Sequence, residues 1–193
     1  MRRRRLVAAA QFAVTGERLP RRLPLLAEEV RRGPHAFVLD LGCGSAPLLD
    51  FVEPERYVGV EDHAGAIASA RERHARPGYE FVEADLVDVS YAAWRGADVV
   101  VLSSVAHHLP ADDLLRLLAR IVTEVEPKRL LLQDAEATGP FGPLVRALDD
   151  GRHLRPKQRL IELLEPGFGV RVLWTYDNPL RSFHQFLLEL APR

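Results

Sequence analysis

Cysteine is almost absent from this sequence. Cys43 is the only one in 193 residues, so the chain can form no intramolecular disulfide and no cysteine-based zinc site. The seven histidines also form no compelling metal-binding constellation. A chain with one cysteine fits a reducing compartment, and we expect a cytoplasmic location.

Net charge is nearly absent as well. The 26 basic and 27 acidic residues leave a formal charge of -1. A general nucleic-acid binder needs a basic surface to neutralise phosphates, so we expect no nucleic-acid partner. No apolar stretch approaches the roughly 20 residues needed to span a bilayer, so we expect no membrane either. A small molecule is therefore the expected ligand.

Internal repeats and linkers are also missing, and 193 residues suit one doubly wound domain. The start, Met1 to Arg5 followed by apolar residues 6–14, superficially resembles a signal peptide. However, the apolar run is short, contains Gln11 and leads to no convincing cleavage site. A helix is the favoured interpretation of this segment.

Hydrophobic periodicity predicts an alternation of helices and strands. Short β-rich runs separated by helical segments indicate parallel strands joined by crossover helices, and apolar runs such as 97–102 indicate strands buried on both faces. The last two runs are joined by a short connection, so we expect them to be antiparallel. The predicted strands are 36–41, 56–60, 79–83, 97–102, 128–134, 170–176 and 182–190, and the predicted helices are 6–14, 23–32, 64–75, 111–125 and 158–164.

The first buried strand opens into a glycine-rich turn, in the sequence Val38-Leu39-Asp40-Leu41-Gly42-Cys43-Gly44. Glycines allow a ligand to approach the backbone closely, and Pro47 suits the first turn of a following helix, whose N-terminus would favour a negatively charged group. An acidic pair, Glu61-Asp62, ends the next strand about 20 residues on, where nucleotide-binding α/β folds bind ribose hydroxyls. Together these features predict a nucleotide-like cofactor.

Two cofactor classes compete for this pattern. A dinucleotide site expects a small residue three places beyond Gly44, where this chain has Pro47. Asp40, two places before the first glycine, would repel a pyrophosphate but suits a cofactor with an ammonium group. Both observations disfavour NAD.

At these residues the chain resembles the class I S-adenosylmethionine-dependent methyltransferases, over roughly residues 36–190. Leu39 to Gly44 resembles their first motif, Gly59 to Glu61 their second and Phe81 to Leu86 their third. The resemblance implies an α/β fold with a three-layer, doubly wound sheet of about seven strands, mostly parallel with an antiparallel last strand. It implies one domain over 1–193, with a helical segment at 1–35, a cofactor-binding half at 36–134, and a substrate lid and closing hairpin at 135–193.

The resemblance also implies a set of cofactor contacts for S-adenosylmethionine. Asp40 and the turn Gly42, Cys43 and Gly44 would hold the methionine part, Glu61 the ribose hydroxyls, Asp85 the exocyclic amine of adenine, and Leu86 the ring. Asp62 and Ser103 are also expected in the cofactor site. The chain departs from the family at Ala46, where a third glycine is common. A positive φ there would cost about 1 kcal/mol or more.

His107 and His108 follow the fourth strand, at the sheet edge where ligands of open α/β folds sit. Many small-molecule methyltransferases have a similar His-His-Leu sequence. Either histidine could remove a proton from an acceptor hydroxyl or amine. Alternatively, both cap the following helix and shape the pocket floor, because transfer to an already deprotonated nucleophile needs only alignment.

The segment after the fifth strand is expected to build the acceptor pocket. Its apolar spacing predicts a lid helix, and the basic residues beyond it either steer an anionic acceptor or, as we favour, form a solvated face. The lid residues are Phe141, Leu144, Val145 and Leu148, and the basic residues are Arg152, His153, Arg155, Lys157 and Arg159.

The predicted function is methyl transfer from S-adenosylmethionine to O, N or C of a small-molecule acceptor. Two alternatives remain open at this point. The chain could bind the cofactor as a non-catalytic sensor or partner subunit, or it could use the cofactor for non-methylating chemistry such as cyclisation. One sequence does not reveal the acceptor, the methylated atom or the oligomeric state.

Overall fold

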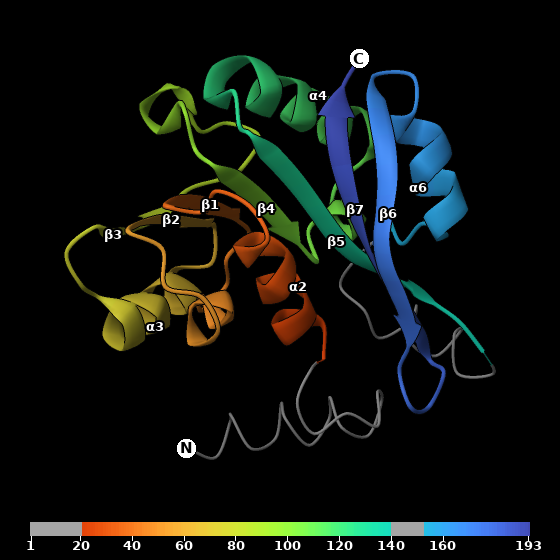
Figure 1. Ribbon diagram of the computed structural model, residues 1–193, viewed down its shortest axis with the longest axis horizontal. Helices are drawn as coiled ribbons and strands as arrows, with labels where there is room; N and C mark the ends of the chain where they lie inside the picture. Colours follow the sequence, from red (N-terminus) through yellow and green to blue (C-terminus); the bar gives the residue numbers. More distant parts are fainter. Residues whose placement is uncertain (1–20, 140–152) are drawn as a thin grey trace.

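Seven strands form one sheet with the order β3-β2-β1-β4-β5-β7-β6 in the computed structural model, which describes residues 21–139 and 153–193 (Figure 1). All neighbouring strands pair in parallel except β7, which is antiparallel to both β5 and β6. The predicted closing hairpin is therefore confirmed. The strands are β1 (Phe37–Leu41), β2 (Arg56–Glu61), β3 (Tyr79–Glu83), β4 (Val99–Ser103), β5 (Arg129–Ala137), β6 (Phe168–Asp177) and β7 (Phe183–Pro192).

Helices cover both faces of this sheet (Figure 1). One face packs on α2 (Arg22–Arg31) and α3 (Ala64–His74), and the other on α4 (Ala111–Arg120) and α6 (Lys157–Leu164). Successive strand residues enter opposite cores, with Val38 on the side of α2 and Leu39 on the side of α4. Burial on both faces explains why the central strands are apolar without alternation. The predicted three-layer α/β fold is confirmed.

Short helical turns connect several of these elements. They are the 3-10 turns η1 (Pro47–Asp50), η2 (Ala92–Trp94) and η3 (Ala106–His108), and a π-helical turn, η4 (Ile121–Val125), that directly continues α4. The predicted helix 111–125 therefore exists as two segments of different pitch. Among the described residues, no helix combines the length and apolar character needed to cross a bilayer.

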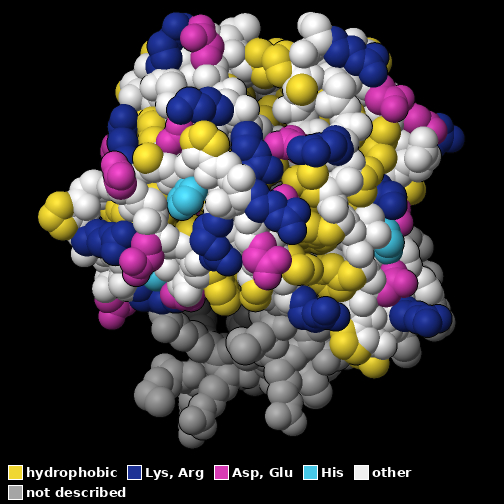
Figure 2. Space-filling model, in the orientation of Figure 1, with side chains coloured by type: hydrophobic (Ala, Val, Ile, Leu, Met, Phe, Trp, Pro, Cys, Tyr) yellow, Lys and Arg dark blue, Asp and Glu magenta, His cyan; other side chains and the backbone are white. Residues whose placement is uncertain are grey.

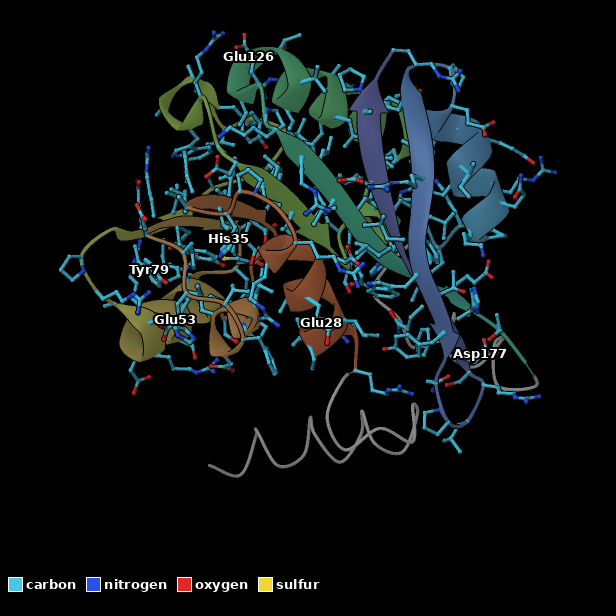
Figure 3. All side chains as sticks on the ribbon, in the orientation of Figure 1. Glu28, His35, Glu53, Tyr79, Glu126 and Asp177 are labelled. Carbon is cyan, nitrogen blue, oxygen red and sulfur yellow. The ribbon has the colours of Figure 1, made fainter. Side chains whose placement is uncertain are left out.

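The chain reverses its direction of progress across the sheet between β1 and β4. From β1 it moves outward to β2 and β3, and it then returns to pair β4 on the other side of β1. Crossovers on either side of such a point leave a crevice at the carboxyl ends of the strands, where ligands bind. Figure 3 helps to locate this edge, because Asp177 at the end of β6 lies on the carboxyl side and Glu126, before β5, lies on the opposite side.

Element ends differ in detail from the prediction. Strand β5 continues to Ala137 because it pairs with β7 from Leu130 to Ala137, and β6 begins at Phe168 because it pairs with the end of β7. The predicted helix 6–14 and the lid residues Phe141, Leu144, Val145 and Leu148 lie outside the described residues.

Candidate cofactor and acceptor site

The glycine-rich turn after β1 folds back over the end of β2. Gly42 and Gly44 have φ angles of 73° and 55°, which favour glycine. The backbone N–H groups of Gly42 and Cys43 both donate to the carbonyl of Val60, at 2.8 and 3.0 Å. A Cβ on Gly42 would lie 2.4 Å from Cγ2 of Val105, so this position has no room for a side chain. The turn is therefore fixed between β2 and the segment after β4.

Ala46 adopts the left-handed conformation considered from the sequence, with φ 54° and ψ 47°. Its methyl group is fully buried, and the conformation costs about 1 kcal/mol relative to glycine. The element that follows is a four-residue 3-10 turn, η1, and not the predicted helix. Pro47 fits the first position of either helix type, and one short turn lacks the aligned peptide dipoles that would bind an anion.

Glu61, at the end of β2, joins this turn to the next one. Its Oε2 accepts from the Gly44 N–H at 2.9 Å, and its Oε1 accepts from the His63 N–H at 3.1 Å. Burial raises the pKa of Glu61, and a hydrogen bond with Asp62 raises it further. Both carboxylate oxygens are thereby oriented before any ligand is present.

A cavity of about 600 Å³ opens beside Glu61, and we call it the main cavity. It brings together six of the predicted site residues, from the ends of β1, β2, β3 and β4: Gly42, Glu61, Asp62, Asp85, Leu86 and His108. Its other lining residues are His63, Ser104, Val105 and Leu109. The sequence distance between these groups is large, but the parallel topology places all of them at one edge.

A smaller cavity of about 170 Å³ lies on the α2 side of the same turn, and we call it the loop cavity. Its lining contains the other predicted cofactor residues, which are Asp40, Cys43, Gly44 and Ser103, and it shares Gly42 with the main cavity. The Ser103 hydroxyl donates to Oε1 of Gln133 at 2.7 Å. The glycine-rich turn therefore lines both cavities, which share Gly42.

Asp40 is the buried acid of the loop cavity. Its carboxylate accepts a hydrogen bond from the Tyr57 hydroxyl at 2.7 Å. Burial raises the pKa of Asp40 to about 6, although the Tyr57 hydrogen bond opposes the shift, and nearby Glu61 adds a small further increase. Asp40 is thus ionised at neutral pH and offers a negative charge to a cationic group.

Arg22, at the start of α2, also lines the loop cavity and was not anticipated from the sequence. It places a cation in the same cavity as the Asp40 carboxylate. An α-amino acid has both charges, so this cavity has the chemistry to bind its ammonium and its carboxylate groups. Sequence pattern could not identify Arg22, because one arginine in an arginine-rich N-terminal region carries no distinguishing signal.

His107 forms a pair with Asp134, at the carboxyl end of β5. Nδ1 of His107 lies 2.6 Å from Oδ1 of Asp134, and the His107 backbone N–H donates to Oδ2 at 3.0 Å. The two side chains are 11% and 4% exposed, so solvent screens this pair weakly. Asp134 therefore holds both the ring and the backbone of His107, a pairing that no sequence pattern indicates.

The second histidine has a different environment. The His108 ring lies 4.2 Å from the His107 ring, centroid to centroid, and lines the main cavity. Neither histidine occupies the N-cap position of α4, which belongs to Pro110. The structure thus brings His108 to the predicted cofactor residues and His107 to Asp134.

Arg155 corrects the interpretation of the basic segment as a solvated face. Its guanidinium donates to the carbonyls of Ala106 and Leu109, at 2.9 and 2.7 Å, on either side of the two histidines. Burial lowers the pKa of Arg155. His153 adds a backbone hydrogen bond to the His107 carbonyl at 3.0 Å. This part of the basic segment supports η3.

The remaining basic residues differ from one another. Arg159 is exposed and pairs with Glu162 at 2.9 Å, as a solvated residue would. Lys157 places its Nζ 3.5 Å from Nε2 of His184, while Arg152 lies outside the described residues. On the face shown in Figure 2, acidic side chains lie among the basic ones.

Comparisons with known proteins agree with this architecture. A family model described as a methyltransferase domain matches residues 38–128, and no curated protein sequence matches the chain. The methyltransferase domain of bacterial CtHen1 is similar, with a TM-score of 0.67 and 17% identity over 88% of this chain and 97% of that one. Magnesium protoporphyrin IX methyltransferase (ChlM) from Synechocystis PCC 6803, solved with bound SAH, has a TM-score of 0.65 and 19% identity over 89% of this chain and 82% of that one.

The N-methyltransferase NodS from Bradyrhizobium japonicum WM9 is also similar, with a TM-score of 0.66 and 14% identity over 90% of this chain and 96% of that one. Likenesses at these identities show the fold, and the match at 38–128 covers β1 through the segment before β5. Residues 38–128 therefore match a methyltransferase domain within a methyltransferase-like fold, and this matched part contains both the glycine-rich turn and the two histidines.

Proposed function

We propose that this chain binds S-adenosylmethionine across the loop and main cavities and transfers its methyl group to an O, N or C atom of a small-molecule acceptor. The observation that carries this proposal is that Gly42 lines both the loop cavity and the main cavity. The loop cavity has the charges that suit an amino acid, and the main cavity has the acidic side chains that suit a nucleoside. A single ligand with both parts fits this arrangement better than two separate ligands.

The residues present suit each part of that cofactor. Asp40 would accept from the ammonium group, and Arg22 would bind the carboxylate. Glu61 would accept from the ribose hydroxyls, as the equivalent acid does in nucleotide-binding α/β folds. Asp85 would accept from the exocyclic amine of adenine, with Leu86 against the ring. When bound, the cofactor supplies an activated methyl group on a positively charged sulfur.

For a hydroxyl or amine acceptor, we assign the base to His107. Asp134 lies against Nδ1, which would place the ring hydrogen on Nδ1 and assign proton acceptance to Nε2. Nε2 would accept the acceptor proton as the acceptor atom takes the methyl group and SAH leaves. The buried Asp134 carboxylate then stabilises the positive imidazolium. A carbon acceptor would use the same arrangement.

Calorimetry with S-adenosylmethionine and SAH tests the proposal first. We expect measurable affinity for both, and no affinity at millimolar concentrations would contradict the proposal. A second step incubates the protein with methyl-labelled cofactor and a small-molecule extract from its source. Labelled product favours catalysis over a sensor role, whereas binding without product would favour the sensor.

A further inference from the structure

Arg120 contacts the segment that carries the adenine-side acid, although it lies on the far end of α4. Its Nη1 donates to the Val87 carbonyl at 2.6 Å, and its Nη2 donates to the Val89 carbonyl at 2.7 Å. A planar guanidinium fixes two acceptors in one geometry, which an ammonium group cannot do. One side chain thus holds two peptide groups of the segment 85–89, which we call the adenine loop.

Glu124 holds the guanidinium from the other side. Nε of Arg120 donates to Oε1 of Glu124 at 2.7 Å, and this hydrogen bond raises the pKa of Arg120. Oε2 of Glu124 accepts from the backbone N–H of Tyr91 at 3.1 Å. Glu124 lies in η4, where the wider π-helical turn follows the end of α4. The junction of the two helices therefore forms a clamp that reaches back to the end of the adenine loop.

Tyr91 completes this clamp from a fully buried position. Its hydroxyl donates to the Leu86 carbonyl at 2.6 Å, and the Arg120 guanidinium lies 5.0 Å from its ring centroid. The peptide group that provides this carbonyl also provides the Val87 N–H, which donates to Oδ1 of Asp85 at 2.7 Å. The clamp is therefore connected by hydrogen bonds to the carboxylate of Asp85.

We propose that Arg120 is a positioning residue that sets adenine selectivity through the orientation of Asp85. This inference rests on the proposed function, in which Asp85 accepts from the exocyclic amine. An ionised carboxylate accepts from the 6-amino group of adenine and repels the 6-oxo group of hypoxanthine. Selectivity between adenine and hypoxanthine depends on how firmly the Asp85 carboxylate is held in place. A displaced carboxylate would bind water and would no longer distinguish the two bases.

The test compares Kd values for SAH and for its 6-oxo analogue, S-inosylhomocysteine, in the full chain. The variants are Arg120→Ala, Arg120→Lys and the control Arg116→Ala. Arg116 lies one turn earlier on α4, where it is exposed and pairs with Asp113. We expect the unchanged protein and Arg116→Ala to prefer SAH by about tenfold or more.

In Arg120→Ala we expect the affinity for SAH to fall about tenfold, because the Val87 and Val89 carbonyls lose a charged donor. The preference for SAH over S-inosylhomocysteine should shrink to about twofold. Arg120→Lys should give an intermediate preference, since one ammonium cannot hold both carbonyls. If Arg120→Ala does not fold, Arg120→Lys alone provides the comparison.

Two results would overturn the inference. One is an unchanged affinity for SAH in both Arg120 variants. The other is an equal loss for both ligands, since a merely structural role would weaken binding without changing the preference. Failure of the unchanged protein to bind SAH at all would instead contradict the proposed function, and this inference with it, before any variant is compared.

Discussion

The hydroxyl of Tyr57 donates to the buried carboxylate of Asp40 across 2.7 Å, between two adjacent strands. Both side chains are inaccessible or nearly so, and the carboxylate has a pKa of about 6 because burial outweighs the hydrogen bond. The acid that would bind the cofactor ammonium is thus close to titration at physiological pH.

Cofactor affinity should therefore depend on pH. Below about pH 6 the free protein holds Asp40 protonated, so binding an ammonium group requires loss of that proton. We expect SAH affinity to be highest near pH 7, where Asp40 is ionised and the ligand amine is still protonated, and to fall by up to about tenfold for each pH unit below 6. Calorimetry across this range tests the prediction.

Two variants identify the group responsible for that pH dependence. Tyr57→Phe removes a bond that lowers the pKa of Asp40, so the decline should move to higher pH. Asp40→Asn should bind weakly with no such decline. A similar decline in Asp40→Asn and in the unchanged protein would assign the titration to another group.

The same acid should reduce the stability of the ligand-free protein. Its folded-state pKa is raised from 3.8 to about 6, so its favourable contribution is complete below pH 3.8 and is lost as pH rises through about 6. Asp40→Asn removes the cost of ionising a buried carboxyl group at high pH. We therefore expect this variant to raise the free energy of unfolding at pH 8 by about 1–2 kcal/mol. Denaturant unfolding at pH 4 and pH 8 measures the difference, and equal effects at the two pH values would contradict the assignment.

Asp134 should matter for turnover and little for cofactor binding. Asp134→Asn keeps the shape but removes the charge that stabilises the His107 imidazolium, so we expect kcat to fall about 100-fold with SAH affinity unchanged. The matched control is Asp177→Asn, because Asp177 also lies 2.9 Å from a histidine Nδ1, that of His184, but is 52% exposed. Full turnover in Asp134→Asn would eliminate His107 as the base.

Glu61 should contribute more to cofactor binding than Asp85. Glu61→Ala removes the ribose acceptor and also leaves the Gly44 and His63 N–H groups without their carboxylate. We expect SAH affinity to fall about 100-fold in Glu61→Ala and about tenfold in Asp85→Ala.

The control for these variants is Glu83→Ala. Glu83 pairs with Glu61 in the register of β2 and β3 but is exposed and does not line either cavity. Its removal should leave the affinity unchanged. Equal affinities in Glu61→Ala, Asp85→Ala and the unchanged protein would refute the site assignment.

The sequence alone predicts the site residues that lie at or next to the carboxyl end of a strand. Asp40, Gly42, Glu61 and Asp85 each occur at or beside the end of an apolar run, and parallel topology brings such ends together. The strand alternation and the closing hairpin were predictable for the same reason, because their signals are local periodicity and connection length.

The contacts that the sequence did not predict join residues that are far apart in the sequence. Asp134 reaches His107 across 27 positions, and Arg155 reaches Leu109 across 46. Neither has a local pattern that distinguishes it from an ordinary charged residue. The helix expected after Pro47 was wrong for a different reason: the left-handed Ala46 redirects the chain into a single 3-10 turn, which no local propensity indicates.

The close approach of Gly42 and Val105 has a consequence for how acceptor preference can vary. The donor-binding turn and the histidine-bearing turn touch through a glycine with no space for a side chain, and Val105 directly precedes η3. Under the proposed function, the spacing between methyl donor and base would depend on this contact, together with Arg155 and His153, which hold η3 from the region after β5. Substitutions after β5 that spare these two residues would then reshape what the chain accepts while the reaction distance stays the same.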